Sequence, residues 1–207
     1  MNPRRWLDFL FPPRVDEEAI REVSADDFLS LMNVQLIATT TPNTVVLLPF
    51  TKMRVRAAIH EAKYRGNGHA FELLAITLAE YLRDADDVGR TTSHIRIVPV
   101  PLGEMRQKER GFNQVEEIVR GAAKELGYVV DSVLLVRTRE TASQVSLPRS
   151  ARKENMRGAF GAAHPADSAY TYIVVDDVIT TGATLQAAIE ALQEAGATHI
   201  IPLALAH

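Results

Sequence analysis

The chain contains no cysteine, which excludes disulfide bonds and any thiolate metal site of the zinc-ribbon kind. Its six histidines are scattered without the spacing of a metal site. It also lacks an apolar run long enough for a membrane-spanning helix. An apolar stretch from Trp6 to Phe11 follows two arginines, as in a signal peptide, but Asp8 interrupts it and Pro12 ends it too early. We therefore expect a cytoplasmic protein with no membrane partner.

A strong charge of one sign is missing as well. Lysine and arginine number 23 against 26 aspartates and glutamates, a formal net charge of −3, so no global basic field indicates a nucleic-acid partner. Hydrophobic residues make up 46% of the chain and charged residues 24%, as in ordinary soluble globular proteins. The 207 residues can bury a sizeable core. We expect one α/β domain with an N-terminal elaboration.

The hydrophobic pattern changes along the chain. The first half is mainly helical, with a short strand over 45–48, helices over 57–65 and 70–82, and a polar linker over 84–93. From residue 95 strands and helices alternate. Strands are predicted over 95–100, 133–136, 172–175 and 200–204, and helices over 113–126 and 184–195. Successive β–α–β units predict a parallel sheet with helices on both faces.

The most informative segment follows the strand at 172–175. It ends in Asp176 and Asp177, at the carboxyl end where open α/β sheets bind ligands. Adjacent strand residues point to opposite faces of a sheet. If the ligand is a sugar phosphate, the two aspartates can therefore reach two hydroxyls of its ribose only if the chain turns there. The next residues offer hydroxyls and backbone N–H groups at a helix N-terminus, a ready anion site: Thr180, Thr181, Gly182, Ala183 and Thr184. The alternative is an ordinary strand–turn–helix with a solvated acidic corner.

A second segment, residues 98–114, leaves another strand and should border the same crevice. Its prolines stiffen the exit and Gly111 permits an unusual backbone angle. Its basic side chains can converge on a polyanion such as pyrophosphate. The candidate ligand contacts are Pro101, Leu102, Arg106, Lys108, Arg110, Gly111 and Asn113, with Asn113 also expected to cap the following helix. The alternative is a solvated charged loop.

A third segment, from Arg137 to Phe160, is long and polar, which is typical of a functional loop that closes over a charged substrate. Arg137, Gln144 and Arg152 are its candidate substrate contacts. Gln144, Arg152 and their neighbours Leu147 and Asn155 could equally fix the fold of the loop itself.

The acidic pair followed by Thr-Thr-Gly resembles the phosphoribosyl-pyrophosphate (PRPP) signature of type I phosphoribosyltransferases. Together with Pro-Val-Pro-Leu and Arg-Gly-Phe-Asn-Gln after residue 98, and with Lys-Tyr-Arg-Gly at 63–66, it is similar to the ComF family of competence-related proteins. The resemblance covers roughly residues 54–206. Many members carry paired zinc-binding cysteines near the start, whereas this chain has none at the corresponding residues 13–18.

The resemblance implies a type I phosphoribosyltransferase fold over residues 54–207, preceded by an elaboration over 1–53. It implies a Mg²⁺-dependent transferase that binds PRPP and an unidentified acceptor, with Asp176, Asp177 and Arg110 as catalytic residues. No side chain is expected to bind Mg²⁺ directly; the ion would be held through PRPP and water near the acidic pair. The acceptor is expected to bind near residues 40–70 and the C-terminal tail, where Lys63, Tyr64 and Arg65 could take part.

Two other functions stay open. A PRPP sensor would keep the pocket without turnover, and a DNA-uptake accessory protein would fit the competence connection although the charge balance does not support it. The oligomeric state is also open, with a homodimer as one option.

Overall fold

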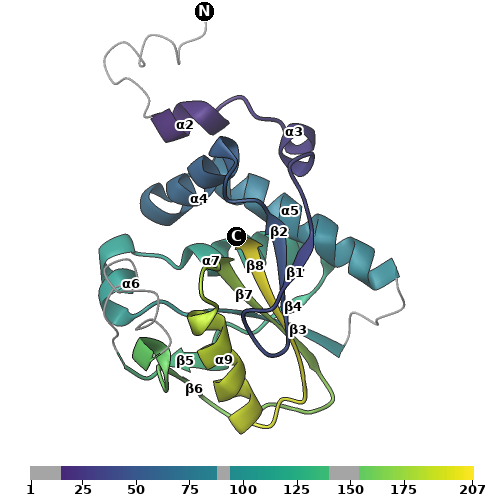
Figure 1. Ribbon diagram of the computed structural model, residues 1–207, viewed down its shortest axis with the longest axis vertical. Coiled ribbons are helices and arrows are strands. Elements are labelled where there is room, and N and C mark those ends of the chain that lie inside the picture. Colours follow the sequence, from purple (N-terminus) through teal and green to yellow (C-terminus); the bar gives the residue numbers. More distant parts are fainter. Residues whose placement is uncertain (1–14, 88–93, 140–153) are drawn as a thin grey trace, which may run out of the picture.

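The computed structural model describes residues 15–87, 94–139 and 154–207 of the chain. Its centre is a six-stranded sheet in the order β1 (Gln35–Ile37), β2 (Thr44–Leu48), β8 (His199–Ala206), β7 (Thr171–Val178), β3 (Ile95–Pro99) and β4 (Val129–Val130). All neighbouring strands are parallel except β1, which pairs with β2 antiparallel. The parallel α/β sheet predicted from the alternating pattern is therefore confirmed (Figure 1).

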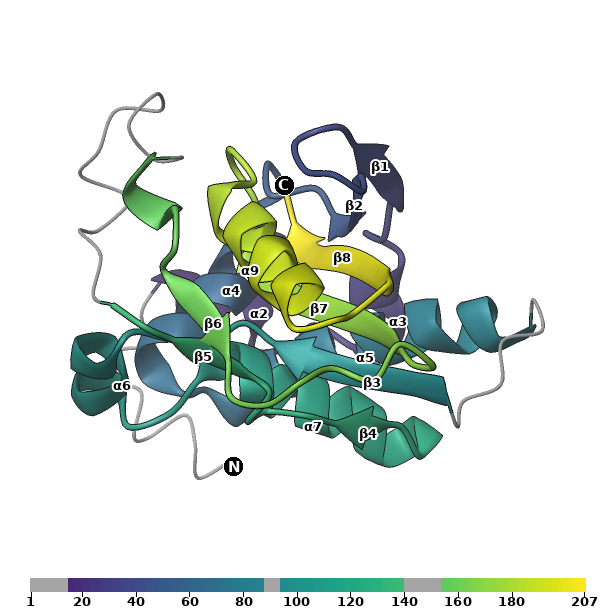
Figure 2. The ribbon, with the colours of Figure 1, turned by 90° about the horizontal axis from the view of Figure 1, so that it is seen from below.

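The two faces of the sheet are covered differently, as Figures 1 and 2 show. On one face Ile173 and Val175 of β7 join a core with α4 (Met53–Arg65), α5 (Gly68–Asp87) and α7 (Gln114–Leu126). On the other, Tyr172 and Val174 pack with α9 (Ala183–Glu194). The alternation along β7 places successive side chains on opposite faces, both of which are covered, and this explains why its sequence is apolar from Tyr172 to Val175. Helices on both faces were expected.

Smaller elements complete the fold. The short helices α2 (Val15–Ile20) and α3 (Ala25–Leu29) contact α4 and α5 respectively, and α6 (Glu104–Arg110) follows β3. A separate antiparallel pair, β5 (Leu135–Arg137) and β6 (Phe160–Ala162), contacts α9. Within the described ranges, no helix combines the length and apolar character needed to cross a membrane.

Three expectations differ from the structure. Residues 104–110 form a helix, whereas the charged run was expected to be a loop. The strand expected over 133–136 lies at 135–137 and leaves the central sheet to pair with β6, while β4 takes the sheet position. The domain boundary expected between residues 53 and 54 falls at the first turn of α4, and β2, before it, pairs in parallel with β8. Residues on both sides of that boundary thus build one sheet.

Candidate functional site

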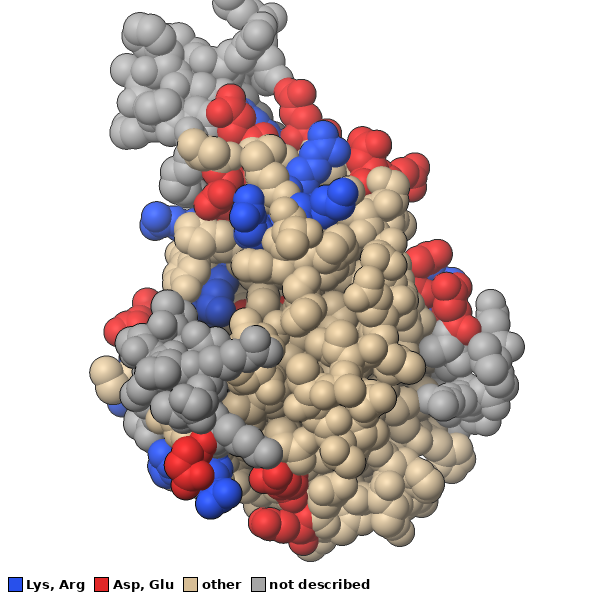
Figure 3. Space-filling model, in the orientation of Figure 1, with Lys and Arg blue, Asp and Glu red and all other residues tan. Residues whose placement is uncertain are grey.

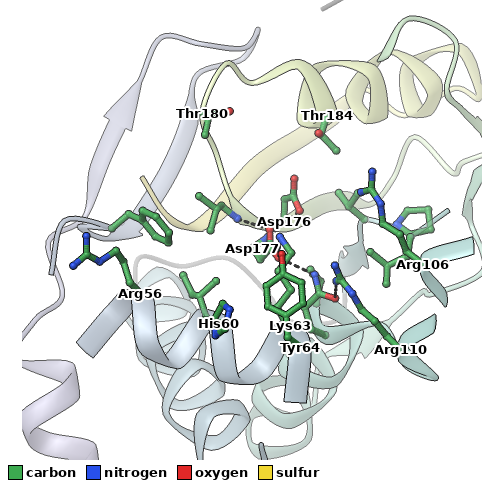
Figure 4. Close-up of a pocket in the computed structure, with 18 of the residues that line it drawn as sticks. Arg56, His60, Lys63, Tyr64, Arg106, Arg110, Asp176, Asp177, Thr180 and Thr184 are labelled. Atoms are coloured by element: carbon green, nitrogen blue, oxygen red, sulfur yellow. Dashed lines mark hydrogen bonds and ion pairs between the residues drawn. The ribbon is translucent and has the colours of Figure 1, made fainter. Parts of the chain in front are cut away.

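The candidate site lies where the strand order reverses. From β3 the chain crosses through α7 to β4 on one side, and from β7 it crosses through α9 to β8 on the other. The carboxyl ends of the adjacent strands β3 and β7 therefore diverge, and open sheets bind ligands at such a point. A cavity of about 470 Å³ opens there, between the loops after these strands and the side of α4 (Figure 4).

The acidic pair lies in the middle of this cavity. Both Asp176 and Asp177 line it, although they lie on a strand that continues to Val178. Local hydrogen bonds orient them: the backbone N–H of Asp177 donates to Oδ1 of Asp176 at 2.9 Å, and that of Val178 donates to Oδ1 of Asp177 at 2.7 Å. The two carboxylates thus reach one cavity, as the ribose hypothesis requires.

The two carboxylates differ in their partners. Oδ2 of Asp177 accepts a hydrogen bond from Nε2 of Gln114 at 2.7 Å and forms an ion pair with Nζ of Lys63 at 3.2 Å. Asp176 has no such ion pair among the described residues. Burial, and then the neighbouring charge of Asp177, raise the pKa of the Asp176 carboxyl to about 7. The Asp176 carboxyl is therefore partly protonated near neutral pH.

The turn after β7 is the segment where the sequence predicts an anion site. A small hollow is lined by Asp176 and by the run from Val178 to Leu185, which includes all five predicted residues at 180–184. Gly182 begins α9 with φ +73°, a backbone conformation that favours glycine. The N–H groups of the first helical turn have no partner inside the helix, and the helix dipole favours a negative charge at this end.

The helix α6 supplies two cations to the cavity, and Figure 4 labels both of them. Arg106 and Arg110 are four residues apart and line the cavity, whereas Lys108 is 79% exposed and pairs with Glu104. The expectation that three cations converge on the ligand was therefore wrong for Lys108. Residues two apart on a helix do not share a face, so Lys108 points away from Arg106 and Arg110. Nη1 of Arg110 donates to Oε1 of Gln114 at 2.9 Å.

Other predicted contacts divide into two groups. Pro101, Leu102 and Arg137 line the cavity. Asn113 is buried and does not: its side chain accepts from the N–H of Val115 and donates to the carbonyl of Val100. The N-cap predicted for this residue is confirmed. Gly111 ends α6 with φ +79° and likewise does not line the cavity. Gln144 and Arg152 lie outside the described residues.

The side of the cavity formed by α4 was predicted from the sequence only in part. Lys63 and Tyr64 were considered for the acceptor site, but Arg56, Ile59 and His60 of the same helix also line it, together with Phe50. The spacing of Arg56, His60 and Lys63 at i, i+4 and i+7 was a signal in the sequence, since such residues share one helix face. Arg65 is exposed and does not line the cavity.

The residue types around the acidic pair bear on metal binding. Across residues 15–87, 94–139 and 154–207, no three carboxylate or imidazole side chains cluster as a metal site. Two carboxylates beside an anion site suit Mg²⁺ that takes its other ligands from substrate phosphates and water.

Comparisons with known proteins agree with this geometry. Residues 89–206 match the family described as "Phosphoribosyl transferase domain". The chain is 34% identical over 143 residues to the DNA utilization protein YhgH of Salmonella typhi and of Escherichia coli K12, and 30% identical over 145 residues to Competence protein F of Haemophilus influenzae. These matches cover 69% of this chain, and 62–63% of the length of the curated relatives. The chain thus belongs to the phosphoribosyl transferase domain family and, within it, to the competence-related ComF proteins.

Proposed function

We propose that the protein is a Mg²⁺-dependent phosphoribosyltransferase that binds PRPP in the 470 Å³ cavity. The observation that carries this proposal is that the acidic pair and the hollow at the start of α9 adjoin one another, sharing Asp176, Thr180 and Thr184. A sugar diol and a 5′-phosphate on one ribose require that combination. In this proposal the phosphate lies on residues 180–184 and the diol on the two carboxylates.

The leaving group then points toward α6. When the bond from the anomeric carbon to pyrophosphate breaks, the electron pair goes to the pyrophosphate and the nucleophile's lone pair forms the new bond to carbon. Arg106 and Arg110 would stabilise the negative charge that develops there, which is worth about 2.7–4 kcal/mol for a well-placed donor. Bound Mg²⁺ would supply further charge neutralisation at the pyrophosphate, with the carboxylates holding it through ribose hydroxyls or water.

The acceptor would enter between the ribose site and α4. That wall combines apolar and aromatic side chains, from Phe50, Ile59 and Tyr64, with the polar His60. Such a lining suits a flat ring better than a fully hydrated small ion.

A pyrophosphate-release screen tests the transferase directly. Purified protein with Mg²⁺ and PRPP is assayed over purine, pyrimidine and amine acceptors, with Asp176→Asn as the inactive reference. We expect release that depends on one acceptor class and is lost in the variant. PRPP binding without release over the whole panel would contradict catalysis and favour the PRPP-sensor function.

A second candidate function, binding of single-stranded nucleic acid, is favoured by a different observation. The helix that walls the cavity exposes Arg54, Arg56 and Arg65, although the whole chain is acidic. The names of the relatives, DNA utilization protein and Competence protein F, point the same way. Figure 3 shows Lys and Arg interspersed with Asp and Glu near this helix, so no continuous basic stripe is visible on that face.

The salt dependence of binding tests this candidate. The logarithm of the binding constant for a labelled oligonucleotide should fall about linearly with the logarithm of the salt concentration. Arg54→Ala should reduce the magnitude of that slope by about one, because one phosphate contact is lost. Absence of binding at micromolar protein and low salt would remove the candidate.

A further inference from the structure

Two segments far apart in the sequence pack against each other beside the cavity. Gly66 ends α4, and a Cβ placed on it would lie 3.2 Å from the ring of Phe112, which follows α6. The guanidinium carbon of Arg110 lies 5.1 Å from the centre of the Tyr64 ring. Residues 63–66 and 110–114 therefore form one packed unit, which we name the α4–α6 junction.

The polar ends of this junction meet at a single carboxylate. Lys63 contributes the ion pair to Oδ2 of Asp177, and Gln114 the hydrogen bond to the same oxygen. Arg110 in turn holds the amide oxygen of Gln114. The side chain of Lys63 is 28% exposed and that of Asp177 only 9%, so water screens this pair much less than a surface salt bridge.

The contacts nearly exhaust what Asp177 can accept. A carboxylate offers about four lone-pair sites, and Val178, Gln114 and Lys63 use three of them. Asp176 accepts a hydrogen bond from the N–H of Asp177. Asp177 therefore has about one acceptor site left for a ligand, and that site has a fixed direction.

A buried charge with fixed partners is costly to disturb. Removing one partner of such a pair leaves an uncompensated charge, and the remaining group turns or becomes protonated. In this cavity the cation that forms the ion pair with Asp177 is Lys63 on α4. The orientation of the second carboxylate thus depends on a helix outside the strand that carries it.

We propose that Lys63 is a positioning residue, which reaches from the end of α4 to Asp177 and holds that carboxylate in the direction needed to accept one ribose hydroxyl. Gln114 holds the same oxygen from α7. The Lys63–Asp177 ion pair then connects the α4 side of the cavity, where the acceptor is proposed to bind, to the ribose site. This inference rests on the proposed PRPP site and adds the role of a lysine within it.

A double-mutant cycle on Mg·PRPP affinity tests the role of Lys63. We expect Lys63→Met to weaken binding at least tenfold in an otherwise unchanged protein. In an Asp177→Asn background the same change should alter affinity by less than twofold, because the group on which Lys63 acts is gone. Lys63→Arg, which keeps the charge, should recover most of the loss.

The control is Lys124→Met, which removes an exposed lysine from the last turn of α7, whereas Lys63 is a half-buried lysine in the last turn of α4. It should leave affinity within twofold of the unchanged protein. A full tenfold effect of Lys63→Met in the Asp177→Asn background would mean that Lys63 contacts the ligand directly, which would overturn the positioning role. Unchanged or tighter binding by Lys63→Met would overturn it as well.

Failure of the proposed function gives a different result. If the unchanged protein does not bind Mg·PRPP, the PRPP site is refuted. The unchanged protein, Lys63→Met, Asp177→Asn and the double variant are then compared by denaturant unfolding without ligand. The positioning role then predicts a coupling between Lys63 and Asp177 of at least fivefold in the unfolding equilibrium constant. Additive effects of the two substitutions would overturn it.

Discussion

The carbonyl oxygen of Thr39 lies directly behind Gly182, where a Cβ would come within 2.7 Å of it. Cβ of Thr39 and Cγ2 of Thr40 also lie 3.0 Å from that position. The turn between β1 and β2 therefore supports the start of α9 from the side where a side chain would project. Gly182 is required both by its left-handed backbone and by this close packing.

Gly182→Ala tests this relationship. Alanine in a left-handed conformation costs about 1–2 kcal/mol, and the clash with Thr39 should add about 1–3 kcal/mol of overpacking. Gly127→Ala is the matched control, because Gly127 has nearly the same φ, +74°, but nothing within 4 Å of its Cβ position. Denaturant unfolding should show a larger loss for Gly182→Ala. Equal losses would show that Thr39 does not crowd this position.

Arg106 should recognise the pyrophosphate part of PRPP. Arg106→Ala removes a cation at the cavity, and a hydrogen bond from a charged group is worth about 1.5–3 kcal/mol. We expect PRPP affinity to fall by about tenfold or more, with little change for ribose 5-phosphate, which lacks the pyrophosphate. Lys108→Ala, on the outer face of the same helix, should change neither. Equal losses for both ligands would contradict the orientation proposed for PRPP.

The raised pKa of Asp176 gives a signature in stability. Its carboxyl titrates near pH 7 in the folded protein, against the ordinary value of 3.8, so the folded state binds this proton more tightly. The free energy of unfolding should therefore decrease as the pH rises from about 4 to about 7. Asp176→Asn removes this contribution and should gain stability relative to the unchanged protein toward pH 8. Parallel pH curves for the two proteins would contradict the raised pKa.

Asn113 should matter for folding and not for ligand binding. Its side chain caps α7 and satisfies the carbonyl of Val100, so Asn113→Ala should cost about 1–3 kcal/mol in unfolding free energy. Mg·PRPP affinity of the folded variant should stay within about threefold of the unchanged protein, since Asn113 does not line the cavity. A large loss of affinity with unchanged stability would restore it as a ligand contact.

Much of the architecture could be predicted because local patterns and the final fold agree. The β–α–β alternation from residue 95 indicated a parallel sheet, and a buried strand that ends in two carboxylates indicated the site at its end. Asn113 with an apolar-periodic helix after it predicted the start of α7 correctly. Each of these signals is set by neighbours in the sequence.

The rest depends on contacts between distant segments. The pairing of β5 with β6 joins two three-residue strands across more than twenty residues, and neither strand is long enough to show a period. The charged segment at 104–110 carries no apolar face, so its helix left no hydrophobic signal. The Lys63–Asp177 pair joins a helix end to a strand more than 110 residues later, and only the fold brings them together.

Isothermal titration calorimetry with Mg·PRPP tests whether this cavity binds PRPP by its diol and its 5′-phosphate. We expect saturable one-to-one binding by the unchanged protein and a loss of at least about tenfold in affinity for Asp177→Asn. Absence of binding by the unchanged protein, or equal affinity of the two proteins, would contradict it.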